Sequence, residues 1–415
     1  SWEAYQTDLK NILLAGEPTQ IMVLRMMNAQ EIRAYLGENQ YNEYIMELSD
    51  EIRSFYREQG ISGEMYFERP AYLYLTLGSE KYIVEKDVSE LLIQIRGRIK
   101  RYADVGVRFD PKVCLIRYPE DLRDYKDILN LGHKFPHIGL SDRMIYRASD
   151  VVHSHNFDII NNMESILNRA VKENRIEMYY QPIYHIESRS FRSAEALARL
   201  FDKEYGMISP AVFIPAAETM GLILPIGDVV LESVFRFISE HDLRELGLSY
   251  IEINLSVAQC MQADLPDIIR HLQEKYGVVP NQVNFEITET TYGDISDLAS
   301  ENIAQLVSEG YSFSLDDYGT GYSNMQRIVK LPLSLVKLDK SLIDEMENED
   351  GESVVRNTIK MMQDIKKLVL AEGVETKSQL DALTAMGCDY IQGFYFSRPL
   401  PEDEFVHFLT SKLQH

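Results

Sequence analysis

The sequence of 415 residues predicts two α/β domains, of which the second is a (β/α)8 TIM-like barrel. From about residue 174 onward, short apolar runs of strand length alternate with amphipathic helical runs, which favours a mostly parallel sheet. Eight such units are typical of a barrel, in which the carboxyl ends of the strands meet at one mouth. Nearly every expected strand also ends in a polar or charged residue. A doubly wound open sheet, the alternative, would not gather all of these ends.

The first part of the chain predicts an α+β domain. In order, we expect a strand at 21–27, a helix at 30–58, a hairpin of strands at 65–67 and 71–77, a helix at 87–102, a strand at 113–117, and helices at 120–131 and 141–151. One further helix over 152–170 would join the domains, and a stiff helical joint can transmit a rotation. We place the domains at 1–155 and 156–415.

The expected barrel strands follow in order, each with a polar residue at or just after its end: 175–180 with Gln181, 191–194 with Glu195, 250–253 with Asn254, 283–285 with Glu286, 312–315 with Asp316, 335–336 with Lys337, 368–370 with Glu372, and 389–391 with Gln392. Between them, helical spacing is present at 229–238, 265–275, 296–309, 353–366 and 378–386, with a last helix around 405–409. Gly310 and Gly387 stand where helices should end.

The polar groups at this mouth favour a metal site. They comprise five carboxylates and one amide, from Glu195, Asn254, Glu286, Asp316, Asp317 and Glu372. Hard oxygen ligands suit Mg²⁺ or Mn²⁺, and the lack of His or Cys at a strand end argues against zinc. Because five negative charges exceed what one divalent ion balances, we expect two ions, with Asp316 as a bridge. Paired metals serve displacement at phosphorus, and Lys337 could orient the attacking hydroxide or neutralise the transition state.

Other interpretations of these residues stay open. Asp316 and Asp317 precede Gly319, so the stretch could be an acidic turn. Lys337 could form a Schiff base with a carbonyl substrate, although nearby carboxylates would keep it protonated. Asp339 could simply cap a helix as part of the structure.

The bulk composition excludes some function classes. The net charge of −23 and the pI of about 4.8 disfavour binding of duplex nucleic acid or anionic membrane through the general field. Cys114, Cys260 and Cys388 form no CxxC pair, so we expect small buried residues of a reduced, cytoplasmic protein. No apolar run approaches the ~20 residues of a membrane helix. The sequence begins at Ser1, so any membrane anchor or sensor would lie in a preceding segment.

Residues from about 160 to 412 resemble the EAL family of cyclic di-GMP phosphodiesterases. The motifs that carry the resemblance appear in the family's order: YQPI at 180–183, EAL at 195–197 with Arg199, NLS at 254–256, EITET at 286–290, DDYGTGYS at 316–323, KLD at 337–339, AEGVET at 371–376 and QGFYFSRPL at 392–400. Ser193 stands where the family often has Gly, and Tyr318 where it usually has Phe. Neither departure removes an expected ligand.

The resemblance implies a role for each motif residue. Glu195, Asn254, Glu286 and Asp316 would hold one metal, and Asp316, Asp317 and Glu372 the other, with Lys337 at the nucleophilic water. Lining the dinucleotide would be Gln181, the Leu197 backbone, Arg199, Asp339, Gln392 and Pro399. Glu289 would fix the loop from Asp317 to Tyr322, where the family couples dimer contacts to activity. The implied reaction is hydrolysis of cyclic di-GMP to linear pGpG by a homodimer that contacts itself through this domain. The alternative is an inactive cyclic di-GMP receptor.

The first domain resembles the GGDEF family of diguanylate cyclases in the order of its elements, and residues 144–148 look like that family's closing helix. At the signature hairpin, however, this chain reads Glu68-Arg69-Pro70-Ala71-Tyr72. The glycines that admit phosphate and the acidic pair that would hold Mg²⁺ are missing, and Pro70 removes a backbone donor. We therefore expect a regulatory domain with no cyclase activity and no GTP binding.

Overall fold

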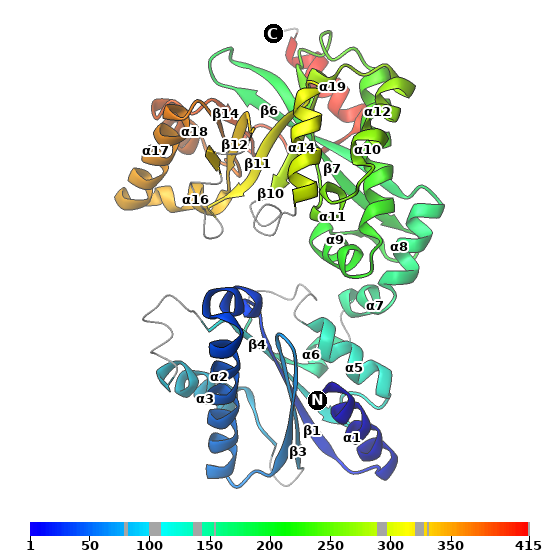
Figure 1. Cartoon of the computed structure of the whole chain (residues 1–415), viewed down its shortest axis with the longest axis vertical. Coiled ribbons are helices and arrows are strands. Elements are labelled where there is room, and N and C mark those ends of the chain that lie inside the picture. Colours follow the sequence, from blue (N-terminus) through cyan, green and yellow to red (C-terminus); the bar gives the residue numbers. More distant parts are fainter. Residues whose placement is uncertain are drawn as a thin grey trace. The chain divides into compact units, whose positions relative to one another are not determined.

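The computed structural model describes residues 1–78, 82–98, 109–135, 143–152, 155–288, 297–319, 328–329 and 332–413. The chain divides into two compact units, Ser1–Met163 and Glu164–His415 (Figure 1). Each unit has its own hydrophobic core, one built from residues between Met22 and Leu115 and the other from residues between Met178 and Leu409.

The first unit is a five-stranded sheet with helices on both faces. Its strands run in the order β2-β3-β1-β4-β5, antiparallel except for the parallel pair β4–β5. The elements along the chain are α1 (Trp2–Ala15), β1 (Thr19–Met26), α2 (Ala29–Glu58), β2 (Gly63–Glu68), β3 (Tyr72–Gly78), α3 (Glu85–Arg98), β4 (Pro111–Tyr118), α5 (Tyr125–Lys134), β5 (Ile145–Arg147), α6 (Ala148–Val152) and α7 (His155–Asn161).

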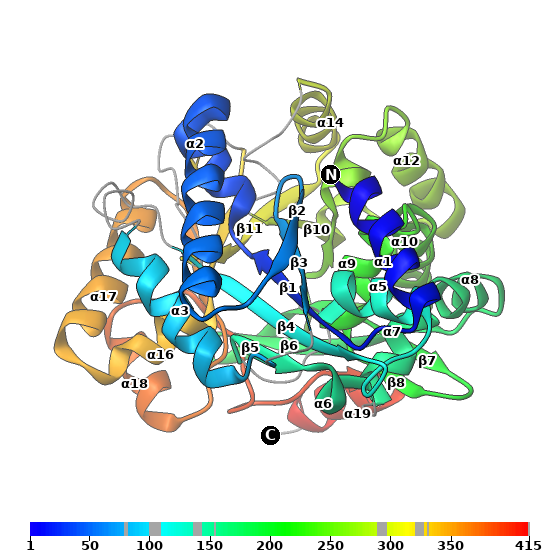
Figure 2. The ribbon, with the colours of Figure 1, turned by 90° about the horizontal axis from the view of Figure 1, so that it is seen from below.

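Strand β1 lies at the centre because its apolar residues are continuous and fill both faces. Met22 and Leu24 belong to the core that α2 and α3 cover. On the opposite face, Val23 lies next to Gly132 of α5, and Tyr5 of α1 stacks on Tyr74 of β3 at 4.5 Å. Figure 2 shows α2 and α3 on one side of the sheet and α1 and α5 on the other.

Three expectations for this unit need correction. Residues 145–147 form strand β5 rather than part of a helix, because the edge of β4 offers partners: the Val113 N–H donates to the Met144 carbonyl at 2.7 Å. Helix α5 begins at Tyr125 rather than near 120, because the Asp124 side chain accepts from two N–H groups of its first turn. The expected joining helix over 152–170 is instead two helices, α7 and α8 (Met163–Lys172), on either side of Asn162.

The second unit is an eight-stranded barrel. The ring runs β6-β14-β13-β12-β11-β10-β9-β7, and the pairing of β6 with β7 closes it. The strands are β6 (Ile176–His185), β7 (Ser190–Asp202), β9 (Tyr250–Asn254), β10 (Val283–Thr288), β11 (Ser312–Tyr318), β12 (Leu335–Leu338), β13 (Leu368–Ala371) and β14 (Tyr390–Ile391), with β8 (Gly206–Ile208) and β15 (Leu400–Pro401) added at the edges.

The barrel confirms the predicted fold class but differs from a regular (β/α)8 repeat at its first strand. Strand β6 is antiparallel to both of its ring neighbours, β7 and β14, whereas the other neighbouring strands are parallel. The short hairpin between His185 and Ser190 forces this reversal, because two strands joined so tightly can only pair antiparallel. Gln181 and Glu195 consequently lie opposite each other in mid-strand rather than at strand ends.

Helices surround the barrel and bury its outer face (Figure 1). Tyr180 of β6, for example, stacks between Phe237 and Phe405 at 4.3 and 5.3 Å. The helices are α9 (Pro210–Thr219), α10 (Ile223–Glu240), α11 (Val257–Cys260), α12 (Leu265–Tyr276), α14 (Asp297–Ser308), α16 (Lys340–Asp344), α17 (Glu349–Asp364), α18 (Lys377–Ala385) and α19 (Glu402–Leu413), with single 3-10 turns at Pro280–Gln282 and Glu345–Glu347.

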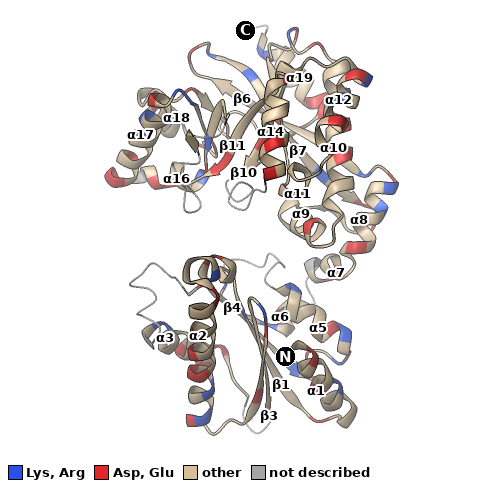
Figure 3. Ribbon diagram, in the orientation of Figure 1, with Lys and Arg blue, Asp and Glu red and all other residues tan. Residues whose placement is uncertain are grey.

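The cysteines, the helix lengths and the acidic residues bear on the expectations drawn from composition. All three cysteines are buried, as predicted. None of the described helices combines the length and the apolar composition that crossing a bilayer requires. Acidic residues lie on outer helices such as α10, α12 and α14 (Figure 3).

Candidate active site

A single lysine lies at the centre of the polar barrel interior. Lys337 of β12 is completely buried, and its Nζ lies within 4 Å of five carboxylates. The distances are 2.7 Å to Glu286, 2.8 Å to Glu372, 3.3 Å to Asp316, 3.4 Å to Glu195 and 3.9 Å to Glu252. Residues from six strands or strand ends thus converge here, as the strand-end pattern predicted for most of them.

Two amides hold Glu195 in place. Asn254 Nδ2 donates to one carboxylate oxygen at 2.9 Å, and Gln392 Nε2 donates to the other at 2.7 Å. Gln392 Nε2 also contacts Gln181 Oε1 at 3.1 Å, and Gln181 Nε2 donates to the Ser397 carbonyl at 3.1 Å. The antiparallel strand β6 therefore delivers Gln181 to the same site from the opposite direction.

The tandem aspartates lie in a β-bulge. The pairing of β11 with β12 loses register between Leu315 and Tyr318, so β11 carries one more residue than its partner there. Asp317 adopts a positive φ of 57°, which is uncommon for a residue other than glycine. In a regular strand two neighbours point to opposite faces. The bulge instead lets oxygens of Asp316, Asp317 and Glu372 all lie within 4.8 Å of one another.

Gly319 fixes the chain just after this bulge. Its φ is 107°, and a Cβ added there would lie 2.2 Å from Leu342 Cδ1. Only glycine fits both the backbone conformation and the close approach of the Leu342 side chain. Thr320 to Tyr322, the rest of the loop expected to regulate the site, lie outside the described residues.

The charges of Lys337 and Glu195 stabilise each other. Burial lowers the pKa of Lys337, but the surrounding carboxylates, Asp316 and Glu195 foremost, raise it well above its usual value. Burial raises the pKa of Glu195, but Lys337 and the amides of Gln392 and Asn254 outweigh burial and bring it below its usual value. A lysine held protonated in this way is a poor nucleophile, so the Schiff-base interpretation loses its support.

The remaining carboxylates are in excess of the one lysine. Burial, with Glu195 next, raises the pKa of Glu286 well above its usual value. Burial raises the pKa of Glu372 to about 8, and burial together with Asp316 raises that of Asp317 to about 6. The site therefore holds more negative charge than Lys337 balances, which is the electrostatic condition that favours divalent cations.

The donor set also fits such cations. Glu286 and Oδ1 of Asp316 are buried, and among the described residues the cation beside them is the Lys337 ammonium, which three further carboxylates share. Buried carboxylates that share one cation are costly, and a metal ion would supply the missing positive charge. Among the described residues, the group that could hold a metal is Asp316, Asp317 and Glu372, all hard oxygen donors, which suits Mg²⁺ or Mn²⁺ rather than zinc.

The residues expected to line a substrate are placed less uniformly. Arg199 of β7 has its guanidinium 5.5 Å from the Tyr179 ring centre and donates to the Ala198 carbonyl. Asp339 caps α16 by accepting from the Ser341 N–H at 2.9 Å, which agrees with the structural interpretation and leaves a ligand role untested. Leu197 lies in β7 opposite Tyr179, and Pro399 directly precedes β15. Glu289 lies outside the described residues.

Sequence reasoning missed Glu252. It lies in β9 and is fully buried, and its carboxylate faces Lys337. A signal was present in the sequence, because residues two apart in a strand share a face. Glu252 precedes Asn254 by two residues, so it had to point into the barrel as well.

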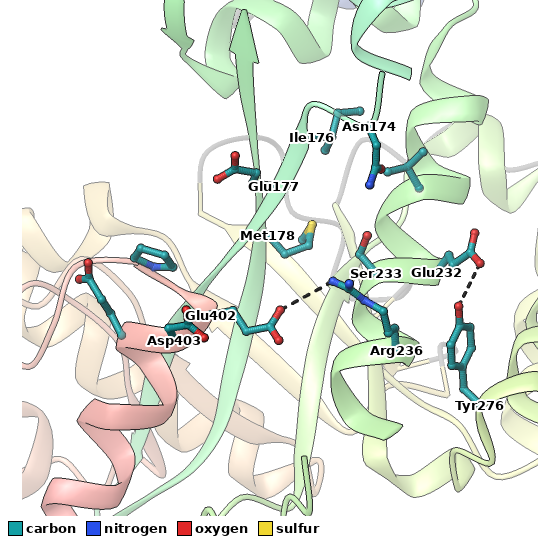
Figure 4. Close-up of a pocket in the computed structure, with 13 residues that line it drawn as sticks. Asn174, Ile176, Glu177, Met178, Glu232, Ser233, Arg236, Tyr276, Glu402 and Asp403 are labelled. Carbon is teal, nitrogen blue, oxygen red and sulfur yellow. Dashed lines mark hydrogen bonds and ion pairs between the residues drawn. The ribbon is translucent and has the colours of Figure 1, made fainter. Parts of the chain in front are cut away.

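A cavity of about 730 Å³ lies elsewhere, on the outer side of the barrel between β6, α10 and the start of α19 (Figure 4). Arg236 lies 3.8 Å from Glu402 across it, and the Tyr276 hydroxyl donates to Glu232 at 3.0 Å. The cavity contains none of the residues that surround Lys337, so its size does not mark the candidate active site.

Known proteins resemble the chain over different lengths. Cyclic di-GMP phosphodiesterase NbdA of Pseudomonas aeruginosa is 29% identical over 430 residues, which cover 99% of this chain and 52% of that protein. The chain spans 31% of the length of two further curated relatives. A solved structure described as "PaMucR Phosphodiesterase, c-di-GMP complex" has 31% identity and a TM-score of 0.56, covering 59% of this chain and 99% of that one.

A second solved structure extends the likeness to both units. "Vibrio cholerae LapD S helix-GGDEF-EAL (bound to c-di-GMP)" covers 94% of this chain and 93% of its own, with a TM-score of 0.73 and 16% identity, which supports the shared fold alone. A family model described as "EAL domain" matches residues 164–399, more than half of the chain. The match contains Glu195-Ala196-Leu197 and every described carboxylate around Lys337, and the chain therefore belongs to the EAL-domain family.

Proposed function

We propose that the second unit hydrolyses one phosphodiester bond of cyclic di-GMP to give linear pGpG, with two divalent cations as cofactors. The observation that carries this proposal is the cluster of carboxylates around the buried Lys337 at the mouth of an EAL barrel. NbdA and PaMucR, which resemble this chain, are both named as phosphodiesterases, and the PaMucR structure contains c-di-GMP.

Two overlapping sets of residues would hold the cations. Glu195, Asn254, Glu286 and Asp316 form one set, and Asp316, Asp317 and Glu372 form the other. Bound there, Mg²⁺ or Mn²⁺ would supply a nucleophilic water at neutral pH and stabilise charge on the phosphoryl oxygens. Asp316 belongs to both sets, and its position at the base of the β11 bulge is compatible with that double role.

The chain's own residues would orient the reactants. The Lys337 ammonium lies among the proposed ligands and would direct the attacking water and stabilise negative charge in the transition state. Gln392 and Gln181 form a hydrogen-bonded pair that positions Glu195 and borders the space for the dinucleotide. Arg199, Asp339, Pro399 and the Leu197 backbone would contact the substrate around it.

The test is product analysis with purified protein and cyclic di-GMP. We expect pGpG with Mg²⁺ or Mn²⁺, none with EDTA, and inhibition by Ca²⁺, whose larger and looser shell would misplace the water. Tight binding of cyclic di-GMP without any pGpG would instead identify an inactive receptor and overturn the enzymatic proposal.

We infer that the first unit regulates rather than catalyses. The turn at its hairpin is occupied by contacts within the protein: Arg69 donates to Glu38 at 3.1 Å and to Asn42 at 3.0 Å, and the Tyr41 hydroxyl donates to the Pro70 carbonyl. The turn over residues 68–72 also contains no glycine, so it offers no glycine-rich backbone to phosphates. Incubation with GTP and Mg²⁺ should yield no cyclic di-GMP, and any cyclase product would contradict this role.

We also propose a homodimer that forms through the second unit, in a cytoplasmic setting. Light scattering of the purified protein would give the expected mass of two chains. A monomer at concentrations where turnover is maximal would refute the dimer without touching the proposed chemistry.

A further inference from the structure

One buried carboxylate has no role in the metal sets proposed above. Glu252 lies two residues before Asn254 in β9, so it points to the same inner face about 6–7 Å deeper along the strand, at ~3.3 Å per residue. Its side chain is completely buried. No amide, hydroxyl or ammonium group of the described residues hydrogen-bonds to its oxygens; the Glu286 carboxyl is its hydrogen-bond partner, and the Lys337 Nζ lies 3.9 Å from Oε2.

The neighbouring positions show that the fold itself does not require a charge there. The positions two residues before Glu195, Asn254, Glu286, Asp316, Lys337 and Glu372 form one deeper layer of the barrel. Of the six such positions, Glu252 is the single charged one; the layer consists of Ser193, Glu252, Asn284, Ser314, Leu335 and Leu370. Leu335 and Leu370 pack in a small apolar cluster with Ile183, so an aliphatic side chain is accommodated at this depth.

A buried carboxylate destabilises a fold unless a cation compensates for the lost hydration, and Glu286, an acid itself, cannot supply that positive charge once it binds metal. Lys337 is the cation within reach of Glu252 among the described residues. The other four carboxylates near Lys337 are those assigned to the metals. Once they bind divalent cations, they can no longer hold the ammonium as strongly, and the cations themselves repel it.

We propose that Glu252 is a positioning residue that holds the Lys337 ammonium from the deep side of the barrel while the other four carboxylates bind metal. This inference rests on the proposed two-metal phosphodiesterase. Glu252 touches neither substrate nor metal, and it acts through Lys337.

The kinetic test compares Glu252→Gln, which keeps the shape and removes the charge, with the parent protein. We expect kcat to fall about 10- to 100-fold, while KM for cyclic di-GMP and the half-saturating Mg²⁺ concentration stay within about twofold. Ser193→Ala in the same layer is the matched control and should keep kcat within about twofold. An unchanged kcat in Glu252→Gln overturns the inference. So does a parallel shift in Mg²⁺ dependence, because that would make Glu252 part of the metal site.

A double-mutant cycle with Lys337→Met separates this inference from the proposed function. Glu252→Gln should lower kcat in the parent but cause no further loss in Lys337→Met. Thermal unfolding with Mg²⁺ supplies a readout that needs no activity: Glu252→Gln should lower Tm in the parent and raise it in Lys337→Met, where the carboxylate has lost its partner. Additive Tm shifts would overturn the pairing. If the parent protein produces no pGpG, the proposed function fails, and the Tm cycle still decides whether the two residues are coupled.

Discussion

Gln20 in the first unit and Lys337 in the second are both fully buried polar side chains in strands, but their surroundings differ. Gln20 exchanges two hydrogen bonds with the backbone of Ile83, at 2.7 and 2.8 Å, and so is satisfied within the fold. Lys337 lies among five carboxylates, which share its single positive charge. Polar burial stabilises the first unit, whereas in the second it creates a site whose negative charge exceeds what its one lysine balances.

The largest loss of turnover should come from removing a proposed metal ligand in the second unit. Glu195→Ala removes a carboxylate that both Asn254 and Gln392 orient, so we expect turnover to fall by on the order of 10³-fold or more through loss of a cation. Formation of pGpG measures it. Glu187→Ala, at an exposed position, is the control, and near-normal activity of Glu195→Ala would remove this residue from the site.

Lys337→Met tests the lysine rather than the metals. We expect kcat to fall by about 10²- to 10³-fold, since a stabilising charge near the reacting phosphate is lost, while Mg²⁺ binding by calorimetry is retained. Lys340→Met makes the same substitution at a nearby, partly buried position outside the cluster and should change kcat less than about twofold. A Lys337→Met enzyme with the parental rate would exclude the lysine from the mechanism.

Removing residues 1–155 tests whether the two units are coupled. Because the barrel has its own core, we expect the site to survive and the rate or its regulation to change by on the order of 5-fold or more. Turnover and oligomeric mass are compared with the full chain. A truncated protein identical in both would show the first unit to be passive.

The excess of acid in the barrel predicts an unusual pH dependence. Raised pKa values of about 8 for Glu372 and about 6 for Asp317 mean that the folded, metal-free protein binds protons more tightly than the unfolded chain. Their stabilising contribution is present below the usual carboxylate range and is lost as pH rises through about 6 and then about 8.

In EDTA, Tm should therefore fall as pH rises from about 4, the pKa range of unfolded carboxylates, to about 8, and saturating Mg²⁺ should remove most of that fall because cations replace the protons. Thermal scans across this range measure both curves. A metal-free Tm that rises with pH would contradict the charge excess.

The smallest effect is expected in the first unit. Gln20→Leu leaves the Ile83 N–H and carbonyl unpaired, so the free energy of unfolding of this unit should drop by about 1–3 kcal/mol. The rate per folded molecule should hardly change. Chemical denaturation followed by turnover at low denaturant separates the two quantities. If Gln20→Leu lowered turnover strongly without lowering stability, Gln20 would have a role in activity, and the contrast with Lys337 would be wrong.

Much of the site could be predicted from the sequence because strand periodicity is local. Polar residues at the ends of apolar runs predicted that Asn254, Glu286, Asp316, Lys337 and Glu372 would meet, and the barrel brings them together. Period two alone would also have predicted Glu252, which is two residues from Asn254 on the same face. The oxygen-rich composition of this set already favoured Mg²⁺ or Mn²⁺ over zinc.

Three features depended on contacts between distant segments. The antiparallel course of β6 follows from its hairpin with β7 and from its pairing with β14, a strand about 200 residues further along the chain. Residues 145–147 became a strand because the edge of β4 was available. The division between α7 and α8 at Asn162 had no periodic signal, since apolar residues continue on both sides.

Asp316 and Asp317 show which features the sequence determines and which depend on the tertiary structure. By itself, the sequence determined that two carboxylates end an apolar strand next to Gly319, and that several other strands end in acids. Only the tertiary structure decided that both carboxylates face the same side, because the pairing of β11 with β12 creates the bulge and the positive φ at Asp317. Hydrophobic patterning is fixed residue by residue, whereas a bulge exists only once two strands are paired, and a buried charge cluster only once the barrel has closed.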